Sequence, residues 1–539
     1  MLPHLSSCLM TPFRISQESS AATGALDASA TELSLADTDS TPRAELTSGG
    51  LLVRNVLWNF AGEGVPTLAA IIAIPVLIHA LGAERFGAFT IVWTMVNYVG
   101  VLDLGLGRTM TKMIADELAA GSSEKIAPVF WTGFYMMALV GVLIGAVLAG
   151  LSPILVYRVF RVSPQFRPET LDAFLVLSAT FPMLITNLGL RGLLGAFQRF
   201  DLISKVRIPG GTLIFIAPLA VLPFSRNLAL LVAVLSFVRM LEWAANFYYC
   251  IAVFPPLRRN LAYATALVKP MLGFGGWVTV SQVVGGQVLV YSDRLLLGAL
   301  ASMSAVAYYA TPFEMITKLR IIPGAIVGVL FPAFAESFAR DRSRAVFLFD
   351  RGVKHSFIAV FPAVLIGATL AHEGLSLWVG RSFADHSALI LQWLAIGLLT
   401  NSLGHTAFIL VQAAHRPDLP AKLHLAEVPL YLPLMWLLIS ARGVEGAALA
   451  WTIRVTLDTA ALFGIAWRLC PEISRSIRGT ALLTAAGVIL LASGGFLLDS
   501  LGARIAFLIV TLVAFAFLTW KLLLSADEKA QIYVTLRRA

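Results

Sequence analysis

Apolar runs of about 20 residues recur along almost the whole sequence, and they constrain the fold more than any other feature. A run of this length is what a helix needs to cross a hydrocarbon core about 30 Å thick. The chain is 58% hydrophobic and 13% charged, whereas soluble domains are roughly 45–50% apolar and 25% charged. We therefore expect an all-α polytopic membrane protein with about fourteen transmembrane helices. The expected spans lie near residues 52–81, 86–107, 127–151, 171–197, 203–224, 228–254, 271–300, 304–334, 355–380, 386–413, 423–440, 444–468, 480–499 and 503–523.

Lys and Arg residues are distributed unevenly between the two sets of loops that these spans create. The loops on the same side as the N-terminus carry most of them, for example the cluster from Arg340 to Lys354. Cytoplasmic loops of membrane proteins carry an excess of Lys and Arg, so both termini are expected in the cytoplasm. The net charge of +9 therefore reflects orientation in a membrane, and nucleic acid is not an expected partner.

Two short polar segments between long apolar runs resemble one another, QRFDLISK at 198–205 and HRPDLPAK at 415–422. Farther along, Arg239 and Arg454 end the similar segments AVLSFVR and ALAWTIR. These matches occur in the same order, which predicts a duplication into two pseudo-symmetric six-helix lobes, arranged as a parallel repeat. We expect a disordered cytoplasmic tail, an N-terminal lobe, a C-terminal lobe, and an additional helix pair with a cytoplasmic tail, at residues 1–50, 51–260, 261–470 and 471–539.

Charged residues interrupt several of the expected spans. A charge in the middle of a bilayer costs on the order of 3 kcal/mol by insertion scales, so such residues face protein or a water-filled cavity. The cations are Arg191, Arg239, Arg294, Lys318, Arg320 and Arg454, and the acids are Glu63, Asp103, Glu242, Asp293, Glu314, Glu427 and Asp458. So many intramembrane charges predict a polar interior, which a passive anchor does not need.

Three stretches carry a resemblance to a known family. They are IPVLIHALGAERFGAFT within the run 55–115, VLDLGLGR at the end of the second span, and SDRLLLGALASMSAVAYYA at 292–310. In these stretches the chain resembles the Wzx-like polysaccharide-biosynthesis flippases of the multidrug/oligosaccharidyl-lipid/polysaccharide exporter superfamily. The resemblance covers roughly residues 52–468 and rests on a pattern of spans and short motifs, without a catalytic signature.

The resemblance implies a two-lobe transporter of the bacterial inner membrane that works by alternating access. Its cargo would be an undecaprenyl-diphosphate-linked oligosaccharide, moved from the cytoplasmic to the periplasmic leaflet. Membrane lipids would be its surroundings, and a polysaccharide polymerase and other assembly proteins would be possible partners. Fourteen spans instead of twelve also occur in this superfamily.

A lipid diphosphate is anionic, and Arg is suited to binding phosphate in a bidentate manner. As phosphate contacts we therefore predict Arg191, Arg294, Lys318 and Arg320. Glu63 and Asp293 are candidates for a coupling H⁺ or Na⁺ site. Two further pairs, Arg239 with Glu242 and Arg454 with Asp458, have the spacing of structural ion pairs on one helix face.

No other cofactor and no metal site is expected, because the three cysteines are far apart in the sequence. Structural pairing is also a reasonable role for Glu314 and Lys318, which are spaced i, i+4. A membrane enzyme of polysaccharide assembly is an alternative, but the short outward loops leave little room for acids and bases. A multidrug antiporter or a lipid II-type flippase of the same superfamily is the closer alternative, although the intramembrane cations favour an anionic cargo.

Overall fold

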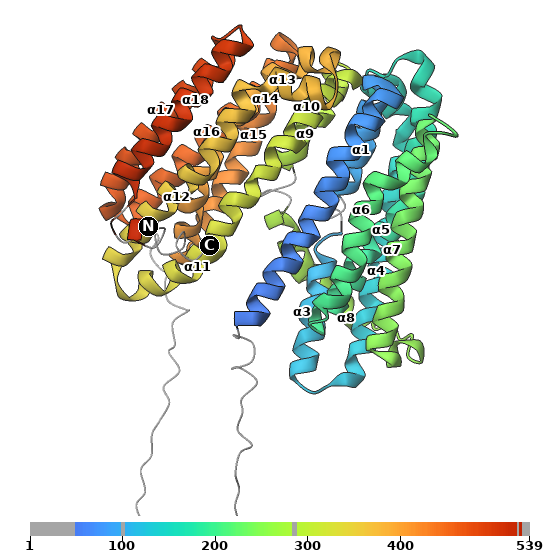
Figure 1. Ribbon diagram of the computed structural model, residues 1–539. Helices are drawn as coiled ribbons and strands as arrows, with labels where there is room; N and C mark the ends of the chain where they lie inside the picture. Colours follow the sequence, from blue (N-terminus) through green and yellow to red (C-terminus); the bar gives the residue numbers. More distant parts are fainter. Residues whose placement is uncertain (1–48, 99–102, 283–287, 525, 527, 531–539) are drawn as a thin grey trace, which may run out of the picture. The chain divides into compact units, whose positions relative to one another are not determined.

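A computed structural model describes residues 49–98, 103–282, 288–524, 526 and 528–530, and these residues form helices joined by short turns (Figure 1). Packing divides the chain into two units, Met1–Trp58 and Asn59–Ala539. The longer helices are α1 (Gly49–Asn97), α3 (Leu106–Ala119), α4 (Ser123–Ile154), α5 (Arg167–Ala196), α6 (Phe200–Val221), α7 (Leu228–Val253), α8 (Thr265–Gln282), α9 (Val288–Leu300), α10 (Met303–Thr317), α11 (Ile321–Arg340), α12 (Arg342–Thr369), α13 (Ala371–Trp378), α14 (Arg381–Ala413), α15 (Asp418–Arg442), α16 (Val444–Leu469), α17 (Ser474–Phe496) and α18 (Leu501–Leu518).

The expected fold class is confirmed, since the described residues contain no strand and include 11 helical segments long and apolar enough to cross a membrane. Four of the expected spans do not stand as separate unbroken helices. The first two are merged in α1, which bends at Gly82, where φ is +77° and a side chain would be strained. Span eight is divided by the 3₁₀ turn Lys318–Arg320, and span nine is divided into α12 and α13. The described parts of span seven are α8 and α9. The count of fourteen stays a prediction.

The two polar segments that suggested a duplication have the same local structure. Gln198 and His415 both have positive φ, +55° and +58°, and each follows the end of a long helix. Arg199 Nε lies 2.9 Å from Asp201 Oδ1, and Arg416 Nε lies 2.9 Å from Asp418 Oδ1. A left-handed residue after the last turn is a common way to end a helix. The two segments are therefore alike in backbone and side chain, while the predicted domain boundaries stay predictions.

Two helices, α5 and α14, are mostly buried, and the other helices pack around them. α5 packs against α3, α4 and α7, whereas α14 packs against α10, α12 and α16. Small residues allow the close approach that is typical of membrane helices. A Cβ at Gly145 of α4 would lie 2.5 Å from the Ser178 carbonyl oxygen of α5, and one at Gly397 would lie 2.4 Å from the Trp451 ring.

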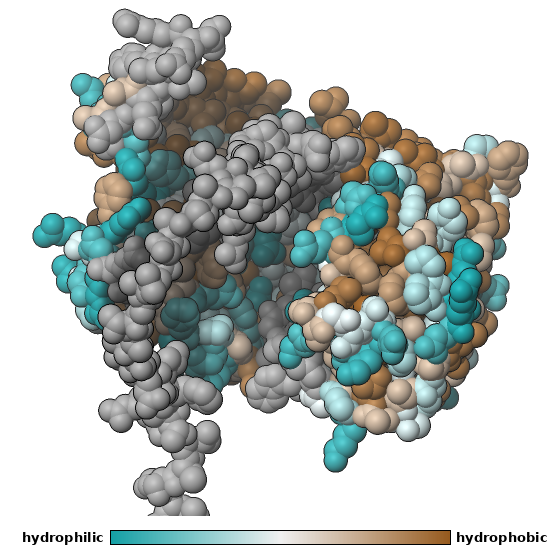
Figure 2. Space-filling view, turned by 90° about the horizontal axis from the view of Figure 1, so that it is seen from below, coloured by the Kyte–Doolittle hydropathy of each residue, from teal (hydrophilic) through white to brown (hydrophobic). Residues whose placement is uncertain are grey.

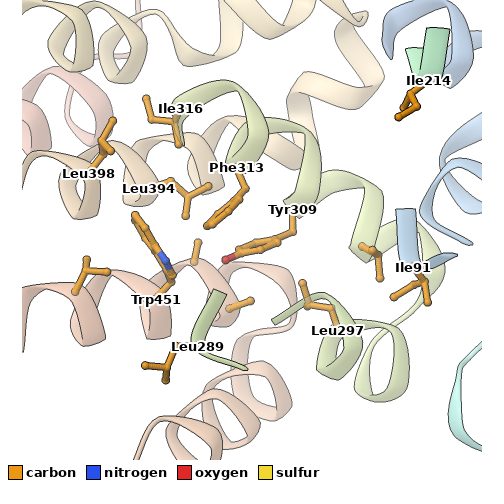
Figure 3. Close-up of a cluster of buried hydrophobic side chains, with 14 of the residues drawn as sticks. Ile91, Ile214, Leu289, Leu297, Tyr309, Phe313, Ile316, Leu394, Leu398 and Trp451 are labelled. Carbon is orange, nitrogen blue, oxygen red and sulfur yellow. The ribbon is translucent and has the colours of Figure 1, made fainter. Parts of the chain in front are cut away.

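Aromatic side chains fill the space between α10, α14 and α16 (Figure 3). The Tyr309 and Phe313 rings stack with their centres 5.5 Å apart, and Phe313 meets Trp451 edge to face at 5.5 Å. Such aromatic pairs contribute about 0.5–1.5 kcal/mol beyond the area that they bury. This cluster fixes α10, the helix that carries Glu314.

The helices of predicted span seven pack against different neighbours. α8 packs against α3 and α4, whereas α9 packs against α10, α15 and α16.

The C-terminal helices α17 and α18 both pack against α12, and α17 also packs against α14. Seen from below, hydrophilic residues (teal) lie among hydrophobic residues (brown) over the described part of the surface (Figure 2).

Candidate functional site

A cavity of about 330 Å³ lies among α1, α6, α9, α10 and α13, and we call it the central cavity. Most of its lining is apolar, but Arg294, Glu314 and Lys318 place three charges in its wall. Binding sites of this kind combine an apolar lining with a few polar groups that fix the ligand's orientation. The lining residues are Thr67, Ala70, Ile71, Ile74, Leu77, Phe86, Phe89, Thr90, Trp93, Ile214, Phe215, Arg294, Ala310, Thr311, Glu314, Met315, Lys318, Gly374 and Trp378.

Arg294 is a cation that the protein surrounds almost completely. The residue is 1% exposed, and its Nη2 lies 2.7 Å from Glu314 Oε1. Its guanidinium carbon lies 5.4 Å from the Tyr291 ring centre and 5.5 Å from that of Phe313. A buried cation requires such a partner, because desolvation of an unpaired charge is costly. The Glu314 side chain is 40% exposed, so one face of this ion pair is open to the central cavity.

The structure separates the four residues predicted to contact phosphate. Arg294 and Lys318 line the same cavity, and Lys318 lies in the exposed turn that follows α10. Arg320 is exposed in the same turn but does not line this cavity. Arg191 lies on α5, where Glu242 and Arg239 are its electrostatic neighbours. Only two of the four therefore share one cavity.

The expected pairing of Glu314 with Lys318 is replaced by a tertiary pair. Glu314 is bonded to Arg294 of α9, and Lys318 has no ion-pair partner among the described residues. The i, i+4 spacing is compatible with a pair on one helix, but the helix ends at Thr317 and Lys318 begins the 3₁₀ turn. The sequence shows that Glu314 is an intramembrane acid, but residue spacing could not identify Arg294, on a different helix, as its partner.

The pair predicted between Arg239 and Glu242 is present on α7, with Arg239 Nη1 lying 2.8 Å from Glu242 Oε2. The Glu242 carboxylate fills the space where α6 approaches α7, and a Cβ at Gly210 would collide with it. A close backbone approach therefore depends on glycine here. The packing agrees with a structural role for this pair.

The pair predicted between Arg454 and Asp458 takes a different form. Arg454 Nη1 lies 3.2 Å from Glu427 Oε2 on α15, and Asp458 Oδ1 lies 3.4 Å from His424 Nε2 on the same helix. The reason is the close packing of α15 against α16. It brings Glu427 to Arg454 and His424 to Asp458, so that each residue of α16 pairs with a residue of α15. Glu427 and His424 are thus members of a polar cluster that helical spacing alone could not reveal.

Asp293, one of the two coupling-ion candidates, is buried beside Arg294. Its Oδ1 accepts a hydrogen bond from the Arg294 backbone N–H at 2.7 Å, while its Oδ2 has no hydrogen-bond partner among the described residues. The hydroxyl groups of Tyr309 and Tyr431 lie nearby, and the Tyr309 hydroxyl faces the Asp293 carboxylate. The side chain of Glu63, the other candidate, lies outside the described residues.

Beside the central cavity, backbone contacts join elements that are far apart in the sequence. The Arg161 backbone N–H donates to the Gly298 carbonyl oxygen at 2.9 Å. Gly87 of α1 packs so tightly against the Met303 carbonyl group that a Cβ there would collide with it. The charge distribution predicts that these contacts face outward, so we name them the outward closure.

Known proteins resemble this chain in sequence and in fold. A Shigella flexneri protein named "Putative O-antigen transporter" is 29% identical over 424 residues, which cover 78% of this chain and 98% of that protein. The structure of the lipid II flippase MurJ, in an inward closed conformation, has a TM-score of 0.65 with 12% identity and covers 86% of this chain and 99% of its own.

A second solved structure, an inward-facing multidrug resistance MATE family transporter, has a TM-score of 0.62 with 14% identity. It covers 77% of this chain and 99% of its own. At these identities the two structures show the fold alone. Residues 52–338, more than half of the sequence, match the family described as "Polysaccharide biosynthesis protein", and the chain belongs to this family.

Proposed function

We propose that this chain moves a lipid-linked oligosaccharide from the cytoplasmic to the periplasmic leaflet of the bacterial inner membrane by alternating access. One observation carries the proposal. Arg294 is buried in the wall of the central cavity and is neutralised by Glu314, a carboxylate that is itself partly exposed to that cavity. An anionic group that enters the cavity can replace the carboxylate without leaving the guanidinium unpaired.

A diphosphate suits this exchange better than a carboxylate does. It offers several oxygens to the planar guanidinium, and Arg binds such groups in a bidentate manner. Lys318, in the same cavity, adds a second positive charge. Arg191 and Arg320 remain proposed contacts for the head group at other stages of the cycle. The apolar part of the lining, which includes Ile71 and Phe89, suits the lipid side of the cargo.

The membrane orientation follows from the loops. We place both termini in the cytoplasm, because the Lys and Arg residues are concentrated on that side. On this placement the outward closure lies on the periplasmic side. Membrane lipids surround the protein, and a polysaccharide polymerase and other assembly proteins are its proposed partners.

A gradient of H⁺ or Na⁺ is the proposed energy source, and Asp293 is the proposed coupling residue. Its carboxylate is buried beside the hydroxyl groups of Tyr309 and Tyr431, which is an environment that a proton or a small cation would satisfy. We expect Asp293→Asn to weaken the binding of ²²Na⁺, or the release of a proton on cargo binding, by purified protein. Unchanged binding of both ions would exclude Asp293 from coupling.

The experiment that tests the function starts from deletion of the gene in its host. We expect complete lipid-linked oligosaccharide units to accumulate on the cytoplasmic leaflet, and the wild-type gene to restore their export. Arg294→Gln should fail to restore export although the protein is abundant and folded. Normal polysaccharide together with altered tolerance of cationic drugs would instead favour a multidrug antiporter, and a block in cell-wall precursor export would favour a lipid II-type flippase.

A further inference from the structure

The short helix α13 forms the part of the cavity wall that reaches across to α1. Gly374 and Trp378 of α13 line the central cavity. The Trp378 Nε1–H donates a hydrogen bond of 2.7 Å to the Ile71 carbonyl oxygen of α1. This bond joins two residues that are far apart in the sequence and that both line the cavity.

The Ile71 carbonyl oxygen is available because of the sequence of α1. Within a helix, the carbonyl of residue i accepts a hydrogen bond from the N–H of residue i+4. The residue four positions after Ile71 is Pro75, which has no N–H to donate. The Trp378 indole therefore satisfies an acceptor that α1 itself leaves open, and this makes the contact specific to one position on the helix.

The other end of α13 is tied to the C-terminal helix pair. Arg504, in the first turn of α18, places its Nη1 at 2.8 Å from Glu373 Oε1 of α13. The same guanidinium donates through Nε to the Leu498 carbonyl oxygen at 2.8 Å. The Arg504 side chain is only 15% exposed and that of Glu373 is 30% exposed. Arg504 is thus fixed to its own turn and to α13 at once.

We propose that the C-terminal helix pair acts as a strut for the outward end of the cavity. Arg504 is a positioning residue: it holds α13 through Glu373, so that Trp378 meets the open carbonyl of Ile71. A helix of eight residues is marginal without such tertiary contacts. The additional helices α17 and α18, which lie outside the predicted repeat, then have a structural role, which is to support α13. The word outward rests on the proposed function, but the mechanical link does not.

The link can be tested without measuring transport. In a variant with its native cysteines replaced by serine or alanine, Thr311→Cys places a thiol in the cavity lining. A membrane-impermeant maleimide, added to right-side-out vesicles, labels this thiol only when the outward end opens. We expect Arg504→Ala to raise the labelling rate about tenfold, a shift of 1.4 kcal/mol in the closed–open equilibrium.

Further variants separate the proposed link from a general loss of structure. Trp378→Phe keeps an aromatic ring but removes the donor, and Pro75→Ala supplies α1 with its own N–H, so each should raise labelling as well. The exchanged pair Arg504→Glu with Glu373→Arg should restore slow labelling. Arg381→Ala is the matched control, since Arg381 is exposed near α13 and has no ion-pair partner among the described residues.

Wild-type labelling rates in both Arg504→Ala and Trp378→Phe would overturn the proposal, as would an exchanged pair that labels as fast as Arg504→Ala. Failure of the proposed function looks different. If the cargo is not a lipid-linked oligosaccharide, the labelling pattern still holds while the export assay in the deletion strain is normal.

Discussion

At the residue scale, the buried charges divide into those whose partner is on the same helix and those whose partner is not. The spacing of Arg239 and Glu242 was sufficient to predict their contact, because a helix places residues three apart on one face. Arg294 and Arg454 have partners on neighbouring helices, Glu314 and Glu427. Those contacts depend on tertiary packing, which cannot be inferred from a single sequence.

Arg294 and Glu314 allow a prediction that separates stability from transport. Removing one member of a buried ion pair leaves an uncompensated charge and costs up to about 3–5 kcal/mol, and partial exposure of Glu314 should reduce this cost. We expect Arg294→Gln to lower the unfolding temperature in detergent and to abolish export. Arg294→Gln combined with Glu314→Gln should recover most of the stability but not export. Export by this double variant would show that Arg294 does not bind the cargo.

At the element scale, the spans that were predicted as continuous but are broken are those that contribute to the cavity. α1 bends at Gly82, and span eight changes to a 3₁₀ turn at Lys318. Hydropathy averages over a window and so detects an apolar segment without showing where its hydrogen-bond pattern changes. The membrane fold was therefore predictable, whereas the shape of the cavity wall was not.

Gly87 provides a prediction about the outward closure. A Cβ at this position would collide with the Met303 backbone carbonyl, and backbone cannot move aside as a side chain can. Gly87→Ala should therefore lower the free energy of unfolding by about 1–3 kcal/mol and raise outward labelling of Thr311→Cys. Gly150→Ala is the matched control, because nothing lies within 4 Å of a Cβ there. Equal unfolding temperatures in the two variants would mean that this contact does not form.

The two helix ends at Gln198 and His415 allow the predicted duplication to be tested by measurements of stability. Both residues hold a left-handed backbone conformation, with φ of +55° and +58°, which costs a residue with a side chain roughly 1–2 kcal/mol. Glycine adopts this conformation freely but loses more entropy on folding. We expect Gln198→Gly and His415→Gly each to raise the unfolding temperature slightly and by similar amounts. A gain at one site and a loss at the other would argue against equivalent roles.

At the scale of the whole molecule, composition and the length of the apolar runs were sufficient to predict a polytopic helical membrane protein. The family followed from short motifs, and the match over residues 52–338 confirms it. The candidate site was predictable only in part: Arg294 and Lys318 meet in one cavity, while Arg191 lies elsewhere. Intramembrane charges can be recognised in a sequence, but which of them share a cavity depends on how the helices bend and pack.

The orientation of the whole molecule decides the direction of transport, and α7 offers a test on a single helix. Arg226 precedes α7 and Asn260 follows it, and both residues are exposed. Because Lys and Arg are enriched in cytoplasmic loops, we expect Arg226→Cys, in the cysteine-free variant, to react with an impermeant maleimide added outside intact spheroplasts. Asn260→Cys should react only after the membrane is permeabilised, so each variant is the control for the other. The reverse pattern would place the outward closure on the cytoplasmic side, and the proposed direction of flipping would then be wrong.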